Sequence, residues 1–142
     1  MNRTLVQNLA LGFGVVFLVV GILGFIPGIT TNYDDLEFAG KDSGAELLGI
    51  FQVSILHNIA HLLFGVGILA ARTHELARTY LLGGAIIYTV LFIYGLFVGG
   101  GDDANFIPMN GAGDVLHLLL AIAFIGAYFV TGRERPAATV TP

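Results

Sequence analysis

Four long apolar segments alternate with short polar ones along this chain. The apolar segments cover about residues 9–26, 47–71, 80–98 and 114–130. A helix needs roughly 17–25 mostly apolar residues to cross the hydrocarbon core of a bilayer, and all four segments fall in that range. We therefore predict an all-α fold, a four-transmembrane-helix bundle with up-down-up-down order, in one domain over residues 1–132. Residues 133–142 are predicted to form a disordered cytoplasmic tail.

Composition agrees with a protein that lies in lipid. Only 11% of the residues are charged and 56% are hydrophobic, whereas soluble domains carry about 25% charged residues. The chain has no cysteine, which excludes disulfides, thiolate metal sites and cysteine nucleophiles. The few basic residues are dispersed, so nucleic acid is not an expected partner. No hydrolase, kinase or nucleotide motif is present, which favours a non-enzymatic protein.

The charges separate into two groups when the four segments are drawn as spans. Five of the six basic residues fall on the side of the two chain ends: Arg3, Arg72, Arg78, Arg133 and Arg135. The opposite side has only Lys41, with eight of the ten acidic residues in or beside its loops. Because cytoplasmic loops carry the excess of Lys and Arg, we predict a multi-pass protein of the cytoplasmic membrane with both termini in the cytoplasm.

The two halves of the chain resemble each other. The first and third apolar segments align as LGFGVVFLVVGILGFIPG and LGGAIIYTVLFIYGLFVG, with Gly24 matched to Gly95. If the similarity reflects a duplicated helical hairpin, the two hairpins are related by a pseudo-two-fold axis along the membrane normal.

The second and fourth segments align in two competing registers. One register matches Asn58-x2-His61 to Asp114-x2-His117, and the other matches His57 to His117. His57 lies 15 residues before Arg72, and His117 lies 16 residues before Arg133. Both histidines are therefore about 23 Å from the cytoplasmic end, and this equal depth favours the second register.

Polar side chains within these two apolar segments are the candidate functional residues. Successive residues of a helix advance by about 100°, so the polar residues of each segment fall on one stripe. We expect the two stripes to face each other and to form one buried cluster, since polar groups within a membrane are costly without partners. The cluster comprises Ser54, His57, Asn58, His61, Asn110, Asp114 and His117.

Three hypotheses explain the cluster. The first is structural: these side chains hydrogen-bond one another, with no cofactor, and stabilise a small accessory or scaffold subunit that contacts another membrane protein or a second copy. The second is a divalent transition metal site formed by His57, His61 and His117 with Asp114, or a haem b held by histidines on facing helices. The third is a path for protons or small solutes, entered at Asp114 and continued by the imidazoles.

The motif HNIAHLLFGVGIL, together with Asn110, Asp114, Leu116 and His117 at the start of the last apolar segment, resembles a known family. It is that of the small four-helix bacterial membrane proteins grouped as domain of unknown function 4383, and the similarity covers about residues 5–132. The resemblance implies a fold and a membrane location but no activity. Its pattern emphasises Asn58, His61, Asp114 and His117 rather than His57, so the sequence leaves both registers open.

Overall fold

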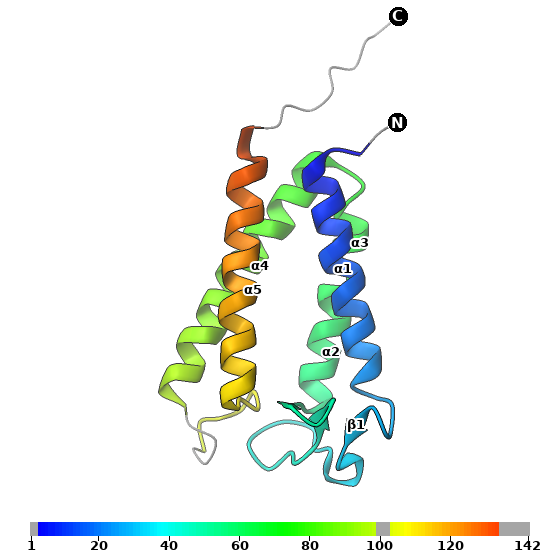
Figure 1. Ribbon diagram of the computed structural model, residues 1–142, viewed down its shortest axis with the longest axis vertical. Coiled ribbons are helices and arrows are strands. Elements are labelled where there is room, and N and C mark those ends of the chain that lie inside the picture. The colour runs from blue at the N-terminus through cyan, green and yellow to red at the C-terminus, as the bar shows by residue number, and fades with distance from the viewer. Residues whose placement is uncertain (1–2, 99–102, 134–142) are drawn as a thin grey trace, which may run out of the picture.

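Helices run along the long axis of the molecule and form two hairpins (Figure 1). In this computed structural model, which describes residues 3–98 and 103–133, α1 (Leu5–Leu23) packs against α2 (Ile55–Phe64) and α3 (Gly67–Ala70). α4 (His74–Phe97) packs against α5 (Gly111–Val130), which ends in the short 3-10 helix η2 (Thr131–Arg133). The first and last described residues lie at the same end of the molecule (Figure 1). Apart from Arg133, the predicted tail lies outside the described residues.

Side-chain caps set where the helices begin. Ser54, Thr73 and Asn110 accept hydrogen bonds from backbone N–H groups three residues later, at 3.2, 3.2 and 2.9 Å. At the start of α1, the side chain of Gln7 accepts a 3.0 Å bond from the backbone N–H of Thr4. These caps satisfy N–H groups that a helix leaves free. Helices α1, α4 and α5 therefore begin several residues before the apolar boundaries that the sequence predicted.

The predicted helix over residues 47–71 is wrong in its first third. Its beginning forms part of an antiparallel sheet of three short strands in the order β1 (Thr30–Thr31), β2 (Glu46–Leu47) and β3 (Phe51–Gln52). Between β2 and β3 the chain turns at Leu48 and Gly49, with φ of 56° and 68°. Short apolar strands and buried helices share the same hydropathy, which is why the sequence pattern did not separate them.

The remainder of that segment is a helix with a break. The chain departs from α-helical geometry between α2 and α3, where α1 approaches so closely that a Cβ on Gly14 would lie 2.9 Å from the Cα of Gly67. The hydroxyl of Tyr80 on α4 donates a 3.0 Å hydrogen bond to the carbonyl of Phe64, the last residue of α2. This bond satisfies a carbonyl at a helix end.

Three of the described helices, α1, α4 and α5, are long and apolar enough to cross a membrane. The broken helix over Ile55–Ala70 is apolar but shorter. At about 1.5 Å per residue it is roughly 24 Å long, somewhat less than the hydrocarbon core of about 30 Å. The protein is a helical membrane protein, and the sheet continues this shorter element at one end.

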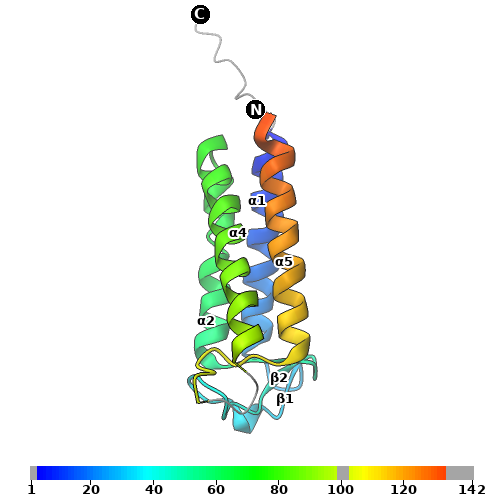
Figure 2. The same cartoon turned by 90° about the vertical axis from the view of Figure 1, so that its left-hand side faces the viewer.

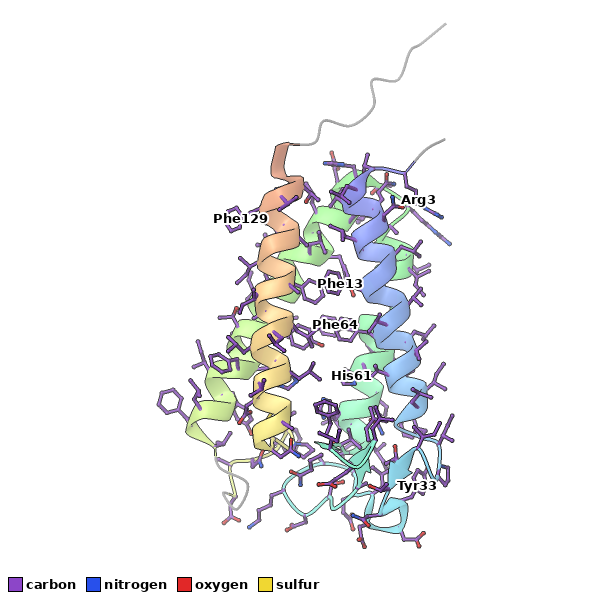
Figure 3. All side chains as sticks on the ribbon, viewed as in Figure 1. Arg3, Phe13, Tyr33, His61, Phe64 and Phe129 are labelled. Carbon is purple, nitrogen blue, oxygen red and sulfur yellow. The ribbon has the colours of Figure 1, made fainter. Side chains whose placement is uncertain are left out.

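Aromatic side chains fill the seam between the two hairpins. Phe124 of α5 is fully buried, and its ring stacks on Phe13 of α1 at a centroid distance of 4.1 Å. The ring of Tyr88 on α4 stacks on the ring of Phe124 at a centroid distance of 5.6 Å. It meets the ring of Phe64 edge-on at 5.3 Å. Phe13 and Phe64 point from the first hairpin toward the second (Figure 3). The core of the bundle is therefore a column of rings.

The sheet and the loop after α4 close one end of the bundle (Figure 2). The backbone N–H of Gly40 donates a 2.8 Å hydrogen bond to the carbonyl of Phe106, so the loops of the two hairpins are joined. The ammonium of Lys41 lies 2.6 Å from the carboxylate of Asp103 and lowers the pKa of that acid. This end therefore carries the loop between α1 and α2 and the loop between α4 and α5, whereas Arg3 lies at the opposite end (Figure 3).

Candidate functional site

Three histidines on two helices meet at the seam between the hairpins. His57 and His61 lie one turn apart on α2, with ring centroids 4.6 Å apart. His117 of α5 faces them, and its ring centroid lies 6.1 Å from that of His57. The two histidines that the sequence placed at equal depth are therefore neighbours. His61 points from α2 into the region between the hairpins (Figure 3).

Aromatic rings from α1 and α4 lie against the histidines. The ring of Phe17 is 5.7 Å from that of His61, and the ring of Tyr88 is 5.6 Å from that of His117. Phe17 and Tyr88 stack on each other at 5.5 Å with an angle of 11° between their planes. The three imidazoles thus lie at one end of the aromatic column.

None of the three imidazoles is fully hydrogen-bonded. The Nδ1 atoms of His57, His61 and His117 are buried and have no hydrogen-bond partner among the described residues. A buried polar atom without a partner costs roughly 1–3 kcal/mol, and most buried polar atoms in proteins are satisfied. Within the part of the chain that the structure describes, the Nδ1 atoms therefore do not join the three imidazoles to one another.

Two cavities flank the histidines, and all three line both. The larger, of about 230 Å³, lies between α2 and α4 and reaches the surface at Ile87 and Phe106, which are 43% and 57% exposed. The smaller, of about 110 Å³, lies on the side of α1, α5 and the sheet. Apolar and aromatic side chains form most of the larger cavity: Leu56, Ala60, Phe64, Ile87, Tyr88, Leu91, Phe106 and Ile107.

Ser54 and Asn110 act as helix caps. The hydroxyl of Ser54 accepts from the backbone of His57 at the start of α2, although Ser54 also lines the larger cavity. The side chain of Asn110 caps α5 and donates a 2.8 Å hydrogen bond to the carbonyl of Ile50. Asn110 therefore fixes the start of α5 to the turn between β2 and β3.

Asn58 faces α1 rather than the imidazoles. It is fully buried and donates a 2.8 Å hydrogen bond to the carbonyl of Gly24, the C-cap of α1. A Cβ added to Gly24 would lie 2.1 Å from the Oδ1 of Asn58. The position thus requires glycine, because any side chain would displace the amide.

Asp114 faces α4 in the same manner. A Cβ added to Gly95 would lie 1.9 Å from its Oδ1, which is buried and has no hydrogen-bond partner among the described residues. Three of the seven residues that the sequence placed in one cluster, Asn58, Asn110 and Asp114, therefore have partners other than the imidazoles, whereas Ser54 lines the larger cavity with them. Within the described ranges, no three His, Cys, Asp or Glu side chains are arranged to hold a metal ion.

With this geometry in place, comparison with known proteins identifies the family. A family model described as a domain of unknown function (DUF4383) matches residues 7–130. The chain belongs to DUF4383. This confirms the resemblance seen in the sequence, over nearly the same residues. Among the curated proteins and among the solved structures, no match to the chain is found.

The contacts of this DUF4383 protein occur in two equivalent sets. Asn58 lies against Gly24 in the first hairpin, and Asp114 lies against Gly95 in the second. Likewise, the Phe17–His61 pair at 5.7 Å corresponds to the Tyr88–His117 pair at 5.6 Å. These pairs follow the register that matches Asn58 to Asp114, not the one that matches His57 to His117. Under this register, Gly113 occupies the position equivalent to His57.

Sequence reasoning missed the aromatic and glycine partners of the site. Phe17 and Tyr88 are ordinary apolar-helix residues, and a ring in a membrane helix is most often packing. For Gly24 and Gly95 there was a signal, since the two align between the halves of the chain and small residues let helices approach closely. However, the alignment of the glycines did not indicate which side chains pack against them.

Proposed function

We propose that this protein is a non-enzymatic, multi-pass protein of the cytoplasmic membrane that binds a small ligand in the cavity lined by His57, His61 and His117. The observation that carries the proposal is the presence of three buried Nδ1 atoms that have no hydrogen-bond partner in the described ranges, beside a cavity of about 230 Å³. Concave apolar sites with a few convergent polar groups are the usual form of ligand sites in proteins.

The lining defines the class of ligand. Pockets for drug-sized molecules measure about 300–1,000 Å³, so this cavity accepts a small molecule or the head of a larger one. Its walls are apolar, with rings from Phe64 and Tyr88. A neutral imidazole offers one donor and one acceptor. The proposed ligand therefore has a small, flat apolar body and a hydroxyl or carbonyl group, and it enters from the bilayer between α2 and α4.

A transition metal ion is the second candidate. Its support is the 4.6 Å separation of the His57 and His61 rings, which lie one helical turn apart, and the nearby ring of His117. Imidazole nitrogen is a common ligand of zinc, copper, nickel and iron. Metal binding would require the side chains to rotate from the arrangement described above. Binding of haem b by the same histidines stays a prediction.

Conduction receives less support from the arrangement. A path from the histidines to the end that carries Arg3 would pass the column of Phe17, Phe64 and Phe124. Phenylalanine side chains offer a proton no hydrogen-bond relay. A role as an accessory subunit also stays a prediction. Its support is that Gly12 and Gly83 face open space, where a partner helix could approach closely.

The experiment compares the purified wild-type protein with His57→Ala, His61→Ala and His117→Ala. Organic extracts are analysed by mass spectrometry, and the same samples by elemental analysis and visible absorption. We expect one organic compound in stoichiometric amount in the wild type and its loss from all three variants. His74→Ala is the matched control, because His74 begins α4 and does not line either cavity.

Each other outcome would assign a different role to the three histidines. A metal or a Soret band lost in the same three variants would replace the organic ligand by the second candidate or by haem. A wild type with neither ligand nor metal, whose three variants unfold more readily, would return the histidines to a structural role and contradict the proposal.

We also propose that both termini lie in the cytoplasm. The support is the basic end with Arg3, Arg72 and Arg78, opposite the end with Lys41 and the acidic loops. The chain has no cysteine, so single cysteines report the side directly. In intact cells, a membrane-impermeant maleimide should label Asp34→Cys but not Glu75→Cys. Labelling of Glu75→Cys alone would reverse the topology.

A further inference from the structure

A polar pocket and an apolar groove adjoin each other along one face of the α4–α5 hairpin. The pocket has a volume of about 250 Å³ and the groove about 340 Å³, and they share Leu82 and Tyr128. Glu75, Arg78 and Thr79 complete the pocket. The groove is completed by Ala85, Ile86, Thr89, Val90, Ile125 and Phe129. The two together have the shape and polarity of an amphiphile.

Arg78 is held in place without being neutralised. Its guanidinium lies 4.4 Å from the centre of the Tyr128 ring, and its Nη1 is buried and has no hydrogen-bond partner among the described residues. Glu75 also lines the pocket, yet within residues 3–98 and 103–133 it forms no ion pair with Arg78. The planar N–H edge of a guanidinium matches the oxygens of a phosphate.

The groove runs in the direction that a lipid tail requires. Arg78 lies near the start of α4, at the end of the molecule that also carries Arg3. From Arg78 to Val90 the helix rises by about 18 Å, slightly more than one leaflet of a hydrocarbon core of about 30 Å. Ile86, Val90 and Phe129 are 57%, 58% and 72% exposed, so the groove is open to the bilayer. Thr89 also lines the groove, but its hydroxyl donates a hydrogen bond to the carbonyl of Ala85, so the groove stays apolar.

We infer that this face binds one phospholipid whose headgroup carries both a phosphate and a primary ammonium. The phosphate contacts the guanidinium of Arg78, the ammonium contacts the carboxylate of Glu75, and one acyl chain lies along the groove from Leu82 to Val90. The charges of the pocket favour this headgroup, because the pocket contains one cationic side chain, Arg78, and one anionic side chain, Glu75. The site is separate from the histidine cavity, and neither depends on the other.

The test is native mass spectrometry of the full-length protein in detergent, titrated with phosphatidylethanolamine, phosphatidylglycerol and phosphatidylcholine of the same acyl chains. We expect phosphatidylethanolamine to bind most tightly. Arg78→Gln should weaken its binding by about fivefold, which corresponds to about 1 kcal/mol for one basic residue near a membrane surface. Glu75→Gln should remove the preference for phosphatidylethanolamine over phosphatidylglycerol.

Two further variants keep the result interpretable. Arg72→Gln removes an exposed arginine at the same end and should leave binding unchanged. Ile86→Trp fills the groove and leaves the polar pocket intact, so it should weaken all three lipids. Equal binding of the lipids to wild type and Arg78→Gln would overturn the proposal. A wild-type preference for phosphatidylglycerol that Glu75→Gln leaves unchanged would overturn the assignment of the ammonium to Glu75.

Discussion

The two hairpins each place a polar side chain against a glycine, but only one of these side chains is hydrogen-bonded there. Asn58 donates to the carbonyl of Gly24 at 2.8 Å, whereas the Oδ1 of Asp114 lies beside Gly95 without a partner among the described residues. An amide has N–H groups to donate, and an ionised carboxylate has none. The Oδ1 of Asn58 also has no partner among the described residues, so the two contacts differ in the N–H donor that an aspartate lacks.

The hairpins differ again at the histidines. His61 and His117 hold equivalent positions beside Phe17 and Tyr88, but His57 has no equivalent in α5, where Gly113 takes its place. His57 lines both cavities, and Asp114 lies in the first turn of α5, whose His117 also lines them. His61 and His117 keep the similarity and also line both cavities, so the site combines a matched pair of histidines with His57, which only the first hairpin supplies.

The largest effect is expected from Asn58→Asp. The substitution gives the first hairpin the side chain of the second at a fully buried position. The carboxylate cannot donate to the carbonyl of Gly24, and an unpaired buried charge costs about 3–5 kcal/mol when one partner of a pair is removed. Unfolding of the detergent-solubilised protein by SDS, followed by circular dichroism, should show a loss of about 3 kcal/mol. Asn58→Gln tests size alone, and an equal loss in that variant would contradict the role of charge.

Alanine at either glycine should destabilise its own hairpin. A Cβ would lie 2.1 Å from the Oδ1 of Asn58 at Gly24, and 1.9 Å from the Oδ1 of Asp114 at Gly95. Overpacking of this kind costs about 1–3 kcal/mol. Gly83→Ala is the matched control, because nothing lies within 4 Å of that position. The double variant Gly24→Ala, Asn58→Ala should recover part of the loss, and strict additivity would show that the two residues are independent.

Asp114→Asn should stabilise the second hairpin. The new amide can donate to the carbonyl of Gly95, as Asn58 does to Gly24, and a hydrogen bond between membrane helices contributes about 0.6–2 kcal/mol. The same SDS unfolding measurement should show a gain of about 1 kcal/mol. Asp114→Ala removes the carboxylate without adding a donor. An equal gain in that variant would mean that only the loss of the unpaired oxygen matters.

A smaller effect is expected when His61 or His117 is replaced by phenylalanine. Each substitution removes a buried nitrogen that has no hydrogen-bond partner among the residues described by the structure, and it keeps a ring beside Phe17 or Tyr88. Replacing an unsatisfied polar group by an apolar one of similar shape is close to neutral or stabilising. We expect stability within about 1 kcal/mol of the wild type, with ligand binding lost. A large loss of stability would favour the structural hypothesis for the histidines.

The smallest effect is expected from Lys41→Ala, which removes the ion pair between the loops of the two hairpins. Because Lys41 lowers the pKa of Asp103, the pair stabilises the protein at neutral pH and loses this contribution as the pH falls through that lowered pKa. Asp103 is 93% exposed, and solvent screens the pair. Thermal unfolding at pH 7 in low salt should show a small decrease that disappears in 1 M salt. A decrease that persists in salt would contradict the electrostatic cause.

Much of this arrangement follows from local patterns that read directly along the chain. Apolar runs predicted the helices, and three of them proved long enough to cross a membrane. The start of α2 was missed because β2, β3 and Ser54 lie in an apolar stretch. Hydropathy reports burial and is silent on whether Leu47 and Phe51 pair with other strands. Helical periodicity predicted inward faces for His57, His61 and His117, whose rings lie 4.6 and 6.1 Å apart, and it assigned Asn58 and Asp114 to the same cluster.

The sequence by itself determined the membrane environment, the helical class and the family, because composition and periodicity act through each segment separately. Tertiary structure alone decided which helix each polar side chain faces. On one helix, Asn58 and His57 differ by only about 100°, yet one meets the carbonyl of Gly24 and the other the ring of His117. That choice depends on where α1 and α5 lie, and hence on glycine and aromatic contacts between segments far apart in the chain.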